Sequence, residues 1–290
     1  MPEKTQESTG RSPSAGRRGF LAGAGTVAGL AMLGNASALS SGGNGDTALA
    51  ATDGLDKPLP YKKLDPADAK PLGRKNYHAG MHCGQGSFDA VVTLLREKVG
   101  GPWNDVPTTA AYWSAGGGAG WSATCGAVVG SNSAISLVHG SSGTTMKLAD
   151  EQQRWYTQHS FPQYTPPGSA SGITKELPTS TSGSILCHES VTKWCQASGY
   201  ASGSAERSER CSRLAGETAA HAIELLNAEA DGNFKAVADA TTPSSVSREN
   251  GCRSCHYKGT NFEQGQFTRG KMSCLQGCHS PAPHMPDSLK

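Results

Sequence analysis

Apolar residues recur at helix-type spacing through the middle of this chain. The clearest series runs from residue 87 to residue 99, with apolar side chains at Phe88, Val91, Val92, Leu95 and Val99. A period of 3.6 residues places them on one face of a helix, for which Ser87 is a suitable N-cap. The Gly100-Gly101-Pro102 sequence that follows is typical of a helix stop. We therefore expect an amphipathic helix over residues 87–99.

The same period predicts four more helices further along the chain. They are expected through Val128, Ile135 and Val138, around Leu148–Tyr156, from about Ile185 to Cys195, and from about Glu206 to Ala228. The stretch 161–184 is rich in Pro, Ser and Thr and is expected to be a loop. No strand pattern is stronger than these helices, so the predicted fold class is mainly α.

Both ends of the chain lack this periodicity. Residues 39–72 hold Gly, Asp, Pro and Ala without a period, and a linker or extended arm is expected there. From Asp231 onward the period is lost again, and residues 231–290 hold too few apolar side chains to form a core. We therefore expect a helical domain at 73–230, followed by a loop-rich segment that something other than side chains must organise.

The first 38 residues have the pattern of an export signal. Arg17-Arg18-Gly19-Phe20-Leu21 resembles the twin-arginine (Tat) motif, although Gly16 stands where Ser or Thr is usual. The apolar stretch after it ends at Leu33 and is too short for a membrane span, which needs about 20 apolar residues. Ala36-Ser37-Ala38 fits an A-x-A cleavage site. The alternative is a chance arginine pair before an uncleaved anchor. We expect a cleaved signal peptide at 1–38, a periplasmic location and no membrane span in the mature chain.

Charge contributes little to the functional interpretation. The chain carries 26 Lys and Arg against 24 Asp and Glu. The expected signal peptide contains four basic and two acidic residues, so 22 of each charge remain in the mature chain. No basic patch of the kind that binds nucleic acid is visible. Nucleic acid is therefore not an expected partner.

Two cysteine motifs near the C-terminus carry the strongest chemical signal. Cys252-Arg253-Ser254-Cys255-His256 matches the C-x-x-C-H signature of covalent c-type haem attachment. Cys274-Leu275-Gln276-Gly277-Cys278-His279 is the same arrangement with one more residue between the cysteines. In each motif two thiols would reach the two vinyl groups of a porphyrin, and the adjacent His would bind the iron. Two covalent haems are therefore expected, with His256 and His279 as proximal ligands.

Other uses of these four cysteines are a four-cysteine zinc site or disulfides. Neither requires a His directly after each cysteine pair, and export favours haem because c-type haem is attached outside the cytoplasm. The haems would also provide the apolar core that residues 250–290 lack. Only 17 residues separate His256 from Cys274, so the two haems must lie close together, which suits electron transfer.

The distal ligand of each haem could be His or Met, and two His ligands give lower potentials. Seven other histidines are available: His78, His82, His139, His159, His188, His221 and His284. Among them, His78 and His82 stand four residues apart in one segment. A single His is often only a polar surface or core residue, so the residues alone leave the distal ligands open.

Five cysteines lie outside the haem motifs: Cys83, Cys125, Cys187, Cys195 and Cys211. An odd number cannot all form disulfides, and an iron–sulfur cluster is one alternative. Structural buried cysteines are another. On one straight helix Cys187 and Cys195 would be about 12 Å apart, too far for one small cluster. Either the helix begins after Cys187 or only one of the two is a ligand.

These features together resemble a known family. The residues that carry the resemblance are His78-Ala79-Gly80-Met81-His82-Cys83-Gly84-Gln85-Gly86-Ser87-Phe88, Gly120-Trp121, Thr124-Cys125-Gly126-Ala127, and the spaced Cys187, Cys195 and Cys211. They are similar to the redox-active family named for its C-GCAxxF-C-C cysteine pattern. With the two haem motifs, residues 73–290 resemble the split-Soret cytochromes c. The sequence departs from the GCA form in having Gly86-Ser87 where Cys-Ala would stand.

The resemblance implies a homodimer with two haems per subunit, each haem with two His ligands. It implies that the haems cluster at the subunit contact, that the partner chain lends one axial His, and that an iron–sulfur centre is present. His78 and His82 become the expected distal ligands. The expected role is electron transfer to a redox partner that the sequence does not identify. The alternative functions are a periplasmic reductase that uses the haem cluster as its active site, or a structural zinc protein. No catalytic acid or base stands out.

Overall fold

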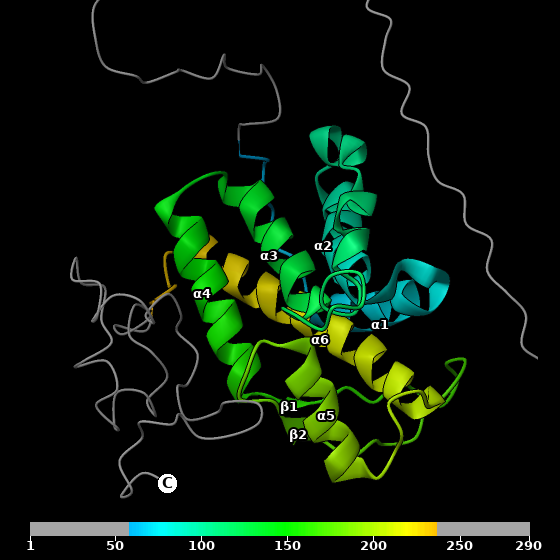
Figure 1. Ribbon diagram of the computed structural model, residues 1–290. Coiled ribbons are helices and arrows are strands. Elements are labelled where there is room, and N and C mark those ends of the chain that lie inside the picture. The colour runs from blue at the N-terminus through cyan, green and yellow to red at the C-terminus, as the bar shows by residue number, and fades with distance from the viewer. Residues whose placement is uncertain (1–57, 237–290) are drawn as a thin grey trace, which may run out of the picture. The chain divides into compact units, whose positions relative to one another are not determined.

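The computed structural model describes residues 58–236, which form a helical assembly (Figure 1). The expected signal peptide at 1–38, residues 39–57 of the expected arm, and both haem motifs lie outside the described residues. Within 58–236 the elements are α1 (Pro66–Asn76), the π-helical turn η1 (Tyr77–Met81), α2 (His82–Lys98), the 3-10 helices η2 (Gly101–Asp105) and η3 (Thr108–Ser114), α3 (Gly126–His139), α4 (Gly143–Gln158), β1 (Ser160–Phe161), β2 (Ser180–Thr181), α5 (Cys187–Ser198) and α6 (Ala205–Ala230). The expected mainly α class is confirmed.

The long helix α6 is the centre of the packing, because α1, α2, α3 and α4 all contact it (Figure 1). The main core lies between α1, α2, α3 and α6, and its fully buried side chains include Val91, Leu95, Ile135, Ile223 and Leu226. A second, smaller cluster contains Tyr77, Cys83, Cys125, Tyr156 and Leu214. Packing of the second cluster therefore brings cysteines from different helices into one region.

Helices α1 and α6 cross with almost no side chain between them. A Cβ added at Gly73 would lie 2.6 Å from the Gly216 Cα, and one added at Gly216 would overlap the Lys70 carbonyl oxygen. Only glycine allows the two backbones to approach this closely. Helix α1 begins at Pro66, where Asp65 caps it by accepting a hydrogen bond from the Ala67 N–H. The boundary expected at residue 73, between the arm and the helical domain, thus falls inside the packed helix α1.

Four of the expected helices are confirmed as α3, α4, α5 and α6, within a few residues at their ends. The fifth, α2, begins at His82, five residues before the expected start. Ser87 is therefore not its N-cap. The Ser87 hydroxyl is fully buried and donates to the carbonyl oxygens of Gly84 and Ala127, so it helps to join α2 to α3.

The expected loop 161–184 is tied down at both ends by two short strands. Ser160 pairs with Thr181 and Phe161 with Ser180 in an antiparallel ladder. Glu217 of α6 accepts hydrogen bonds from the backbone N–H groups of Gln163 and Tyr164, at 2.9 and 2.8 Å. In the part of the chain that the structure describes, no helix is long and apolar enough to cross a membrane.

Candidate metal centre

A cavity of about 430 Å³ lies where α2, α3, α5 and α6 meet the turn after η3. Four cysteines line it: Cys83, Cys125, Cys187 and Cys211. The rest of its wall includes Tyr77, His82, Tyr112, Trp113, the glycine-rich turn through Gly116 and Gly120, Ser190, Arg207, Arg210 and Leu214. None of the five cysteines in residues 58–236 forms a disulfide.

Three of the four cavity cysteines stand at helix N-termini. Cys83 is the second residue of α2, Cys125 is the N-cap of α3, and Cys187 is the first residue of α5. The unpaired N–H groups of a helix N-terminus give it a partial positive charge, which favours a thiolate over a thiol. The starts of three helices therefore converge on a position suited to negatively charged sulfur.

Backbone pairing fixes two of these cysteines next to each other. The Cys125 N–H donates to the Ile185 carbonyl at 2.8 Å, and the Cys187 N–H donates to the Ala123 carbonyl at 2.7 Å. These bonds surround an antiparallel bridge between Thr124 and Leu186. The two chain segments that lead into α3 and α5 thus start their helices side by side.

Cys195 does not line the cavity, although it lies on the same helix as Cys187. Helix α5 includes both residues, which are eight positions apart, and only Cys187 belongs to the cavity wall. Of the two arrangements left open by the sequence, the structure has the one in which the helix includes Cys187 and a single cysteine of the pair faces the site.

Three of the four cavity thiols, those of Cys83, Cys125 and Cys187, have a raised pKa and are therefore neutral at physiological pH. Burial, and then the neighbouring Cys125, raise the pKa of Cys83 to about 12. Burial likewise raises the pKa of Cys125 and of Cys187, and the other cavity cysteines add to the rise for Cys187. Four thiolates would therefore be present together only with a bound cationic metal, since coordination deprotonates a thiol outright.

Two arginines from α6 face the same cavity. Arg210 is 1% exposed and donates from Nη2 to the Ser190 hydroxyl at 2.8 Å and from Nη1 to the Cys211 sulfur at 3.9 Å. Arg207 is less buried and is held by the Ser202 carbonyl. No Asp or Glu is among the described residues of the cavity wall. The pocket thus combines four sulfur donors with two cations, which favours a group of net negative charge.

The four thiols are not arranged around a single metal ion. In the described part of the chain, no three His, Cys, Asp or Glu side chains are placed to hold one metal ion. The sulfur ligands of one zinc each lie about 2.3 Å from the metal, so they must crowd together. The four cysteines instead line a cavity of about 430 Å³.

The two histidines expected as distal haem ligands lie on one exposed turn, residues 78–82. His82 has a φ of +55° and reaches the cavity wall, where its ring lies edge-on to Tyr77 at 5.9 Å between centroids. His78 points elsewhere, and its Nε2 is 2.8 Å from the Glu209 carboxylate. Both side chains are accessible to a second molecule, but the structure does not bring them to the same place.

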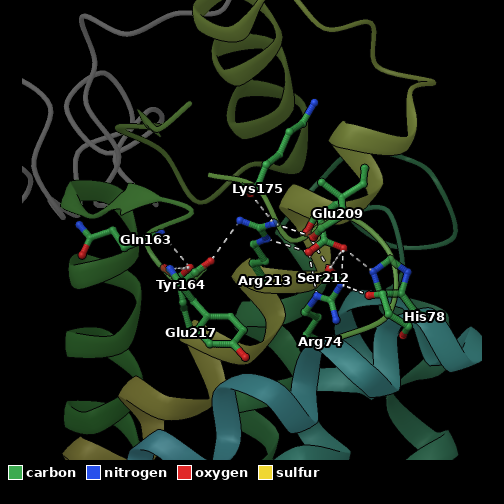
Figure 2. A network of polar contacts seen from close by, with 11 residues as sticks. Arg74, His78, Gln163, Tyr164, Lys175, Glu209, Ser212, Arg213 and Glu217 are labelled. Carbon is green, nitrogen blue, oxygen red and sulfur yellow. Dashed lines mark hydrogen bonds and ion pairs between the residues drawn. The ribbon is translucent and has the colours of Figure 1, made fainter. Parts of the chain in front are cut away.

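His78 is attached to a buried ionic network, which Figure 2 shows around Glu209. The Glu209 carboxylate is 2% exposed and receives hydrogen bonds from the Nε atoms of Arg74 and Arg213, both at 2.7 Å. Burial alone would raise the pKa of Glu209, but the hydrogen bonds from the two arginines and His78 outweigh it and hold that pKa below its usual value. A negatively charged carboxylate therefore orients the His78 ring.

Sequence reasoning identified the cysteines but missed the arginines. Arg207, Cys211 and Leu214 follow one another at helical spacing on α6. The spacing alone could have indicated that Arg207 shares a face with Cys211. Nothing in the sequence indicates that Arg210 is fully buried.

Comparison with known proteins gives three matches. The family model described as "Putative redox-active protein (C_GCAxxG_C_C)" matches residues 81–225, which include the four cavity cysteines. The split-Soret cytochrome c of Desulfovibrio desulfuricans is 34% identical over 272 residues, covering 91% of this chain and 94% of that protein.

A solved structure also matches, described as a novel iron centre in the split-Soret cytochrome c from Desulfovibrio desulfuricans ATCC 27774. The TM-score is 0.68 at 32% identity, covering 80% of this chain and 93% of that one. The family pattern contains the block Gly-Cys-Ala-x-x-Gly, whereas residues 125–130 of this chain read Cys-Gly-Ala-Val-Val-Gly, with the first two residue types exchanged.

Proposed function

The chain belongs to the split-Soret cytochrome c family, and on that premise we propose that it is a periplasmic electron-transfer cytochrome with two covalent c-type haems and an iron–sulfur centre. Haem and an iron centre are named for the relative and for its solved structure. The two C-x(2–3)-C-H motifs at Cys252–His256 and Cys274–His279 supply the matching attachment chemistry in this chain.

The observation that carries the iron–sulfur part of the proposal is the shared cavity of Cys83, Cys125, Cys187 and Cys211. Three of these thiols are at helix N-termini, and a buried arginine with an unpaired Nε stands beside them. These residues would hold the cluster, which when bound supplies a one-electron carrier. Cys195 lies outside the cavity and is not part of the proposed ligand set.

For the haems, we propose that the exposed turn 78–82 provides distal ligands to a second copy of the chain. His78 is 41% exposed at its side chain, and Glu209 fixes its ring, as a carboxylate commonly does for a metal-bound His. His82 lies four residues further along the same turn. An isologous dimer would give each subunit's haems access to the other subunit's turn and would cover the exposed porphyrin.

The haem content is tested by mass spectrometry and haem staining of the denatured, exported protein. We expect a mass above that of the cleaved chain by two haems. A rise of one haem would remove the Cys274–His279 motif from the proposal.

The distal ligands are tested by spectra and sedimentation of His78→Ala and His82→Ala. Loss of a low-spin haem in one variant identifies the ligand. Two intact low-spin haems in both variants, or a monomeric wild type at micromolar concentration, would contradict the intersubunit arrangement. Resistance of the haems to carbon monoxide and cyanide would separate an electron carrier from a reductase with an open haem.

The iron–sulfur centre is tested by iron content in protein prepared without air. We expect more than two irons per chain and a cluster signal in electron paramagnetic resonance. The double variant Cys125→Ser with Cys187→Ser should lose the additional iron and keep both haems, whereas Cys195→Ser should keep it. Two irons per chain in the wild type, with no cluster signal, would refute this part of the proposal.

A further inference from the structure

A buried arginine without an acidic partner stands against the cavity thiols. Arg210 is 1% exposed, and among residues 58–236 no carboxylate forms an ion pair with it. Its Nε is buried and has no hydrogen-bond partner. A buried charge is strongly unfavourable unless an opposite charge compensates it. Among the described residues, the groups near Arg210 that could carry the compensating charge line the same cavity.

Arg210 contacts one cavity sulfur and one hydroxyl of the cavity wall. Its Nη1 donates to the Cys211 sulfur at 3.9 Å. Its Nη2 donates to the buried Ser190 hydroxyl at 2.8 Å, and Ser190 also accepts from the Tyr156 hydroxyl at 2.9 Å. The guanidinium is thus held at the cavity wall by Ser190 of α5 and lies against a proposed cluster ligand.

We infer that Arg210 is a positioning residue that compensates the charge of an anionic iron–sulfur centre and raises its reduction potential, with Ser190 holding the guanidinium at the cavity wall. The inference rests on the proposed function, because it assumes the cluster in this cavity. Reduction adds one negative charge to the centre, and a buried cation nearby favours that state more than the oxidised one. Hydrogen bonds to sulfur and burial are among the properties that set cluster potentials.

Arg207 provides a matched comparison at the same cavity. It also lines the cavity, but it is only partly buried and is held by the Ser202 carbonyl. Solvent screens a partly exposed charge more strongly than a buried one. Removing the charge of Arg207 should therefore change the potential less than removing that of Arg210.

The experiment uses full-length protein exported and loaded with haem, prepared without air. Wild type is compared with Arg210→Met, Arg210→Lys and Arg207→Met. Dithionite donates one electron per centre, and electron paramagnetic resonance follows the cluster. For Arg210→Met we expect at least a tenfold smaller equilibrium constant for reduction, which is about 59 mV for one electron. Arg210→Lys should recover part of the shift, and Arg207→Met should shift the potential least.

A second measurement separates this role from a structural one. In metal-free protein the charge of Arg210 is uncompensated, so Arg210→Met should melt at the same temperature as the wild type or higher. In cluster-loaded protein Arg210→Met should melt lower. Equal destabilisation of both forms would indicate a structural role and would overturn the inference.

The remaining outcomes are also decisive. If Arg210→Met loses the non-haem iron while Arg207→Met keeps it, the inference is supported, and Arg210→Lys then gives the shift in potential. If Arg210→Met loads the cluster at the potential of the wild type, the inference is refuted while the proposed function stands. A wild type with no iron beyond its haems would refute the cluster itself, and the inference with it.

Discussion

Replacing Glu209 by Gln should destabilise the protein far more than its single charge suggests. The Glu209 carboxylate is the shared partner of Arg74 and Arg213, whose side chains are 8% and 1% exposed. Gln is nearly the same size, but its amide has one neutral acceptor oxygen where Glu209 has two charged ones. It therefore cannot accept hydrogen bonds from both guanidinium groups and from His78. Two buried cations would then face each other without a counter-charge, and removing one partner of a buried ion pair typically costs about 3–5 kcal/mol.

The lower end of that range is expected here. Arg74 keeps its hydrogen bond to the Ser171 carbonyl, and Arg213 keeps those to Ile173 and Lys175. A loss of about 3 kcal/mol corresponds to a fall of roughly 6–12 °C in Tm, at roughly 2–4 °C per kcal/mol for a domain of this size. Circular dichroism of the full-length exported protein during heating would measure it.

Glu206→Gln is the matched control, one helical turn away. Its carboxylate is 3.5 Å from the Lys175 ammonium, which is 57% exposed, and surface pairs of this kind contribute about 0–1 kcal/mol. The control should therefore melt within about 4 °C of the wild type. If the loss of unfolding free energy in Glu209→Gln is within about 1 kcal/mol of the loss in Glu206→Gln, the buried network does not have the role assigned to it.

Three further predictions follow from the same contacts. Gly216→Ala should lower the urea midpoint by an amount equivalent to about 2 kcal/mol, because overpacking against the Lys70 backbone outweighs the gain in helix propensity. Gly203→Ala is the control, because a Cβ added there has no atom within 4 Å. Equal urea midpoints for the two variants would contradict the close approach of α1 and α6. The pKa of Glu209 is below its usual value in the folded protein, so the contribution of this carboxylate to the free energy of unfolding is complete above the unfolded pKa of about 4.3 and is lost as the pH falls through the folded pKa. The free energy of unfolding, measured from pH 6 to pH 2, should therefore fall less steeply for Glu209→Gln than for the wild type. Parallel curves would argue against this. The pKa of Cys83 is about 12, so in metal-free protein at pH 8 iodoacetamide should alkylate this thiol roughly a hundredfold or more slowly than free cysteine. Peptide mass spectrometry would measure the rate. Alkylation at the rate of free cysteine would show an open, ionised thiol.

Hydrophobic periodicity identified the helices but not all of their limits. Helices α3, α4 and α6 agree with the sequence because each repeats buried residues at 3.6-residue spacing. The start of α2 did not follow from sequence because its first turns, His82 to Gly86, are polar or glycine residues. Cys83, Gly84, Gln85 and Gly86 are nevertheless buried, since η1, η3 and α3 pack around them. Close packing of glycines, not an apolar stripe, determines where that helix begins.

The sequence by itself determined the chemistry that is local in the chain. The mainly α fold class, the five spaced cysteines and the attachment motifs at Cys252 and Cys274 can all be read from neighbouring residues. Only the tertiary structure decided that Cys83, Cys125, Cys187 and Cys211 share a cavity, that Cys195 does not, and that Arg210 is buried against them. The reason is physical: periodicity fixes which face of a helix is apolar, whereas the distance between side chains on different helices depends on how those helices pack.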